Sequence, residues 1–137
     1  MRTVQRLLLA CLAAFSGLAS AADTPFRFDR QPTIELAVAH IRADFEKHPQ
    51  DALPGVDFDH PLVVAVRDGA HRRFVFVSFT STLAKWGEYV IVELCGSPAH
   101  AVVNGAGRVI DIDFFRKVVS KLGPTTKLAL PNVCAAG

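Results

Sequence analysis

The chain lacks the short motifs that mark the best-known enzyme classes. Among its 137 residues we find no His-x-x-x-His or Cys-x-x-Cys pair, no Gly-x-Ser-x-Gly elbow and no Walker loop. Those patterns place zinc ligands, a serine nucleophile or nucleotide phosphates at fixed spacings. Their absence argues against the corresponding metalloenzymes, hydrolases and nucleotide-binding enzymes. We therefore expect no catalytic residue, no metal and no cofactor.

Long apolar runs are also scarce, and the one at the start is too short to cross a membrane. Leu7–Phe15 is continuously apolar, whereas a spanning helix needs about 20 such residues. It follows Arg2 and Arg6 and precedes small residues at 19–21, which is the pattern of a cleavable signal peptide. Cys11 lies inside the run rather than after it, so we expect it to be lost with residues 1–21 and not to carry a lipid anchor.

An excess of charge is missing once residues 1–21 are removed. The whole chain has 15 basic and 13 acidic side chains, and Arg2 and Arg6 belong to the signal segment. A balanced domain has no strong field for nucleic acid or anionic lipid. We predict a single α+β domain over residues 22–137, located in the periplasm, with no nucleic-acid partner and no stable membrane anchor.

Cysteine is rare, with three residues in all, and only Cys95 and Cys134 remain after cleavage. An even number of cysteines in an exported chain is typical of a disulfide framework. We therefore predict a structural disulfide between these two residues.

What the chain does contain is a clear order of regular elements. Apolar residues at helical spacing, including Ile34, Val38 and Ile41, predict a helix over Pro32–Lys47. Alternating or apolar stretches then predict four to five strands: Leu62–Arg67, Arg73–Ser81, Glu88–Cys95, Ala99–Val103 and Arg108–Ile112. The second of these is apolar on both faces, which favours a central position.

A short helix is expected near the C-terminus, over Phe114–Leu122. Asp113 is the expected N-cap, and Phe114, Val118 and Leu122 form the expected packing stripe. Short connections between the strands favour an antiparallel meander. The predicted fold is one N-terminal helix packed on a curled antiparallel sheet, an arrangement that resembles the cystatin-like and NTF2-like layout, although no family motif of either is present.

The most suggestive functional residue is Trp86, the only tryptophan. It is either an interface anchor or a lid over the open end of the sheet, and the sequence leaves both possibilities open. Together with Lys85, Ser97 and His100 it makes our candidate binding surface. The leading hypothesis is a protein-binding module, of inhibitor or immunity type, whose partner is another exported protein.

The alternative is a carrier or sensor of a small apolar ligand, held between the first helix and the strand that bears Phe74, Phe76 and Phe79. A third and weaker hypothesis is a cone-shaped α+β enzyme. The sequence assigns no buried acid–base pair that such an enzyme would need.

The expected processing can be checked by intact mass. Protein purified from a periplasmic extract should have the mass of Ala22–Gly137, and reduction should add the mass of two hydrogen atoms. A mass that includes acyl chains on Cys11 would contradict the cleavage prediction and identify a lipoprotein.

Overall fold

The computed structural model describes residues 26–136 apart from 70 and 124, and it describes only the backbone of 97–106 and 135–136. The predicted signal peptide, with Cys11, lies outside the described residues. The elements follow in this order: α2 (Arg30–Lys47), the 3-10 turn η1 (Pro49–Asp51), β1 (Leu62–Asp68), β2 (Arg72–Phe79), β3 (Gly87–Cys95), β4 (Ser97–Val109), α3 (Ile112–Ser120) and α4 (Val133–Ala136). Within the described part of the chain, no helix is long and apolar enough to span a membrane.

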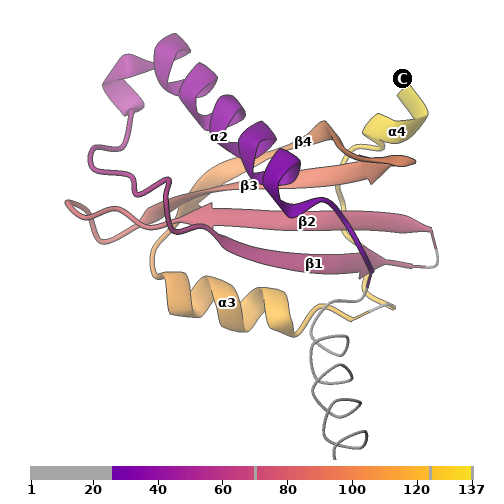
Figure 1. Cartoon of the computed structure of the whole chain (residues 1–137). Helices are drawn as coiled ribbons and strands as arrows, with labels where there is room; N and C mark the ends of the chain where they lie inside the picture. Colours follow the sequence, from indigo (N-terminus) through magenta and orange to yellow (C-terminus); the bar gives the residue numbers. More distant parts are fainter. Residues whose placement is uncertain (1–25, 70, 124, 137) are drawn as a thin grey trace, which may run out of the picture.

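The four strands form one antiparallel sheet in the order β1-β2-β3-β4. The long helix α2 crosses one face of the sheet, chiefly over β3 and β4, and α3 lies on the opposite face (Figure 1). This confirms the predicted α+β layout, with four strands in a sheet that curls without closing. The predicted helix and first three strands are all present, with ends shifted by at most two residues.

Each face of the sheet carries its own hydrophobic core. Under α2, the side chains of Ile34, Ala37 and Ile41 pack on one set of strand residues: Val75, Val77, Phe79, Val90, Val92 and Leu94. On the other face, Phe115 and Val119 of α3 pack on a second set: Val66, Phe74, Phe76, Ile91 and Val109. Because successive strand residues point to opposite faces, β2 supplies both cores. This confirms its predicted central position.

The predicted break between a fourth and a fifth strand is present only as a register shift against β3, between Tyr89 and Ile91. The segment forms the single 13-residue strand β4, and the expected turn at Asn104–Gly107 lies within it. Gly107 is paired with Tyr89, and a Cβ atom at this position would lie 2.8 Å from the tyrosine ring. A glycine inside a strand often marks such a close approach rather than a turn.

The predicted register of the C-terminal helix is also wrong. Asp111, not Asp113, is the N-cap, since its Oδ1 accepts a hydrogen bond from the Asp113 backbone N–H at 2.8 Å. Phe115 and Val119 are buried, whereas Phe114 and Val118 are 62% and 46% exposed. The helix contains two apolar stripes one residue apart, and periodicity cannot decide which of them faces the sheet.

The start of β3 depends on a glycine. A Cβ atom on Gly87 would overlap the carbonyl oxygen of Phe79 and lie 3.3 Å from the Cα of Thr80. We expect Gly87→Ala to reduce the free energy of unfolding by about 1–3 kcal/mol, the usual range for overpacking, as measured by urea denaturation. Gly123→Ala is the control, since a Cβ atom at that position would have no heavy atom within 4 Å. Equal losses in the two variants would contradict the steric argument.

Candidate functional site

An open groove lies where β2 ends and β3 begins. Its volume is about 400 Å³. One wall is formed by residues of the β2–β3 connection, and the other by residues between β4 and the first residue of α3. The lining residues are Thr80, Ser81, Ala84, Lys85, Trp86, Gly87, Ile110, Asp111 and Ile112.

Large apolar side chains are exposed at and beside this groove. Trp86 is 42% exposed and Ile110 is 78% exposed. Leu83, in the same connection as Trp86, is 75% exposed. A scattered exposed leucine is ordinary, but several large apolar residues around one hollow are typical of an interaction site.

Hydrogen bonds fix the backbone that carries Trp86. The Ser81 hydroxyl donates to the Pro54 carbonyl at 2.7 Å and accepts from the backbone N–H groups of Leu83 and Ala84 at 3.1 and 3.0 Å. The Thr82 N–H donates to the Gly55 carbonyl at 2.8 Å. The connection is therefore tied to the loop before β1, which limits the entropy that Trp86 would lose on binding.

Two charged side chains lie at the groove, and they differ in their surroundings. Lys85 is exposed on the β2–β3 connection. Asp111 is the N-cap of α3, which holds one of its carboxylate oxygens at the helix terminus. The groove thus offers one exposed positive charge and one negative charge that the helix terminus orients.

The structure does not bring the four predicted binding residues together. Lys85 and Trp86 immediately precede β3, whereas Ser97 pairs with Cys95 at the far end of that strand. Nine residues of strand correspond to roughly 30 Å. His100 also lies in the first part of β4, and the side chains of Ser97 and His100 lie outside the described residues. The two pairs therefore belong to opposite ends of the sheet.

Sequence reasoning missed the second wall of the groove. Ile110 and Ile112 were expected to belong to a strand, and neither carries a sequence signal that marks it as exposed or as a neighbour of Trp86. Their position follows from the pairing of Gly87 with Val109, which brings the start of β3 next to the end of β4.

The rings proposed to line a ligand cavity lie on two different faces of the sheet. Phe79 belongs to the core under α2, whereas Phe74 and Phe76 belong to the core under α3. All three are buried among other side chains. They therefore do not line one space between the helix and the sheet.

An ion pair between buried Glu88 and partly exposed Arg108 ties the turn η1 to the sheet. Glu88 is 7% exposed, and its Oε1 lies 3.3 Å from the Nε of Arg108. Burial raises the pKa of Glu88, and the neighbouring Arg108 opposes that rise. The Arg108 guanidinium also donates to the carbonyl oxygen of Asp51, so the pair holds η1 against β3 and β4.

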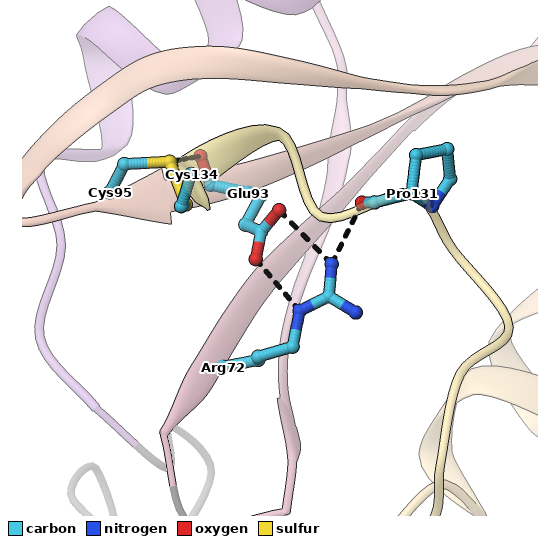
Figure 2. The surroundings of a disulfide bond; sticks show 5 residues. All are labelled: Arg72, Glu93, Cys95, Pro131 and Cys134. Carbon is cyan, nitrogen blue, oxygen red and sulfur yellow. Dashed lines mark hydrogen bonds and ion pairs between the residues drawn. A yellow bond between two sulfur atoms is a disulfide. The ribbon is translucent and has the colours of Figure 1, made fainter. Parts of the chain in front are cut away.

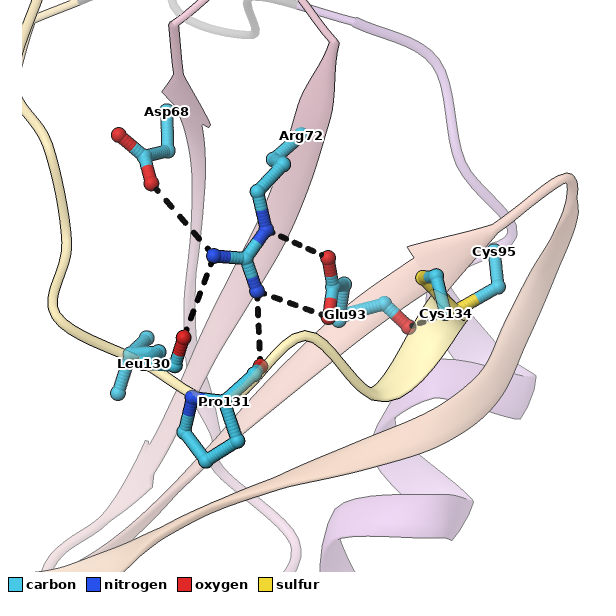
Figure 3. A network of polar contacts seen from close by, with 7 residues as sticks. All are labelled: Asp68, Arg72, Glu93, Cys95, Leu130, Pro131 and Cys134. Atoms are coloured by element: carbon cyan, nitrogen blue, oxygen red, sulfur yellow. Dashed lines mark hydrogen bonds and ion pairs between the residues drawn. A yellow bond between two sulfur atoms is a disulfide. The ribbon is translucent and has the colours of Figure 1, made fainter. Parts of the chain in front are cut away.

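A second ion pair lies at the other end of the sheet. Glu93 is almost fully buried, and its carboxylate accepts two hydrogen bonds from Arg72, at 2.8 Å from Nε and 3.1 Å from Nη2 (Figure 2). The same guanidinium donates to the carbonyls of Leu130 and Pro131 at 3.3 and 2.8 Å (Figure 3). The hydrogen bonds to Glu93 raise the pKa of Arg72. Arg72 therefore joins β2, β3 and the C-terminal segment.

The predicted disulfide between Cys95 and Cys134 is present beside this ion pair (Figure 2). The two sulfur atoms and a Glu93 oxygen lie within 4.8 Å of one another, a grouping that resembles a set of metal ligands. The two sulfurs are covalently bonded to each other, however, and both Glu93 oxygens accept hydrogen bonds from Arg72. The geometry supports a structural role for this cluster.

The Arg72–Glu93 pair can be tested by removing one partner or both. Arg72→Met leaves a buried carboxylate without its cation, and we expect it to reduce the free energy of unfolding by about 3–5 kcal/mol. Arg72 also lies 3.9 Å from the buried carboxylate of Asp68, which loses its cation in both variants. The double variant Arg72→Met/Glu93→Leu removes the uncompensated charge of Glu93 and should therefore lose less stability than the single variant. Arg73→Met, at the neighbouring and partly exposed position, is the control. A double variant less stable than Arg72→Met would contradict the argument.

Comparison with known proteins identifies no relative of this chain. No family model, no curated protein and no solved structure matches the chain. Its function must therefore be argued from its own geometry.

Proposed function

We propose that the protein is an exported protein-binding module, of inhibitor or immunity type, that acts on a secreted enzyme or toxin. The observation that carries the proposal is the groove beside Trp86, with an indole that is partly exposed and held on a hydrogen-bonded connection. Tryptophan contributes more binding energy than most residues at protein interfaces, especially where a neighbouring hollow receives a partner side chain.

The composition of the groove supports binding rather than catalysis. Its large apolar residues are Trp86, Ile110 and Ile112, and Lys85 and Asp111 are its charged residues. Asp111 is used in capping α3. Large apolar side chains together with a few charged groups are typical of a protein interface.

The location outside the cytoplasm is part of the same proposal. The Cys95–Cys134 disulfide supports it, because such bonds persist in oxidising compartments. The N-terminal pattern of two arginines, a short apolar run and small residues is the reason to place the protein in the periplasm.

Trp86→Ala tests the proposal. Since Trp86 is 42% exposed, the variant should keep nearly the wild-type melting temperature. It should weaken capture of the partner from an extract of exported proteins by about 30-fold, the loss typical of an interface hot spot of about 2 kcal/mol. Wild type and Trp86→Ala are immobilised in equal amounts. Lys47→Ala, at the exposed end of α2, is the control and should capture the partner as wild type does.

Two outcomes would count against this function. A fall of many degrees in the melting temperature of Trp86→Ala would assign the indole to the core. Capture of the same proteins by wild type and Trp86→Ala in equal amounts would exclude the groove as the docking site.

A further inference from the structure

The outer face of α3 carries an apolar stripe that no described residue covers. Phe114 and Val118 are 62% and 46% exposed, although Phe115 and Val119 already fill the core beneath the helix. Residues four apart lie on the same side of a helix, so the two exposed side chains are neighbours. Ile110, which is 78% exposed, lies just before the helix. Packing of the sheet does not account for this second stripe.

Lysines flank the stripe. Lys117 and Lys121 follow Phe114 and Val118 by three residues each, so they lie beside them on the helix surface. Arg116 is exposed on the same helix. None of these three cations forms an ion pair with a residue that the structure describes. We call Phe114, Lys117, Val118 and Lys121 the α3 outer face.

Charge is distributed unequally between the two sides of the sheet, although the protein is nearly neutral. The segment 26–61, which contains α2, has seven acidic and four basic side chains. The segment 110–136 contains α3, which lies on the opposite side of the sheet (Figure 1), and has four basic and two acidic side chains. A negatively charged surface would therefore attract the α3 side and repel the α2 side.

We propose that the α3 outer face docks reversibly on an anionic membrane surface. Exposed apolar side chains beside lysines are the pattern of a helix that lies in the interface, where the apolar groups enter the acyl boundary and the lysines reach the phosphates. The face is the convex outside of a helix, so it suits a flat bilayer better than a protein pocket. The inference goes beyond the proposed function and does not depend on it.

The charges predict a weak and salt-sensitive association. A lysine or arginine near an anionic surface increases binding about fivefold. The short stripe of Phe114 and Val118 adds apolar contact but cannot anchor the protein by itself. We therefore expect binding that is lost when the ionic strength is raised.

Co-sedimentation with vesicles tests the inference, using protein purified from a periplasmic extract. Wild type should sediment with vesicles of phosphatidylcholine mixed with phosphatidylglycerol and not with phosphatidylcholine alone. Lys117→Glu/Lys121→Glu should reduce the bound fraction by more than tenfold, and Phe114→Ser/Val118→Ser should also reduce it. Arg30→Glu/Lys47→Glu, with the same change of charge on exposed positions of α2, should bind as wild type does.

Each contrary result would overturn the inference. The first is that wild type does not bind, and the second is that it binds equally to both kinds of vesicle. The third is that Arg30→Glu/Lys47→Glu reduces vesicle binding as much as the α3 variants do. If Phe114→Ser/Val118→Ser fails to fold, the lysine variant decides alone, because its substitutions are on exposed side chains. Failure here leaves the Trp86 capture experiment unaffected, since that experiment contains no membrane.

Discussion

The ion pair between Arg72 and Glu93 is the constraint on which the C-terminal half depends. A carboxylate that is about 1% exposed needs a partner, since leaving a buried charge unpaired costs about 3–5 kcal/mol. Arg72 satisfies it with two hydrogen bonds and uses its other donors on the carbonyls of Leu130 and Pro131. The guanidinium also lies 4.7 Å above the ring of Phe74. The C-terminal segment thereby stays over the second core, where the disulfide also holds it.

The two ends of the sheet are therefore held by different contacts. At the Cys95 end, a disulfide, an ion pair and backbone carbonyls hold the segments together. At the Trp86 end, the β2–β3 connection is also fixed by hydrogen bonds, but apolar side chains remain in contact with water. The covalent link lies at the first end and the candidate docking groove lies at the second. An exposed side chain of the groove such as Trp86 can thus be changed with little effect on the fold.

Much of the architecture was predictable from local patterns, and the errors have physical causes. The helix, the first three strands and the disulfide follow from periodicity and from the even number of cysteines. Gly107 was misread as part of a turn, because its contact with the Tyr89 ring arises only when β3 and β4 pair. The side of α3 that faces the sheet was misread because adjacent apolar pairs, Phe114-Phe115 and Val118-Val119, give two equivalent stripes. The groove could not be foreseen, since Trp86 and Ile110 meet only through strand pairing.

The placement of the two strongest chromophores has a consequence for spectroscopy. The chain has a single tryptophan and a single tyrosine. Trp86 is partly in water, whereas Tyr89 lies in the second core with its ring centroid 5.5 Å from that of Phe115. Indole emission will therefore respond to occupation of the groove more than to loss of the core. Tyrosine absorbance will respond to unfolding, so docking and folding can be followed in one sample by two separate optical signals.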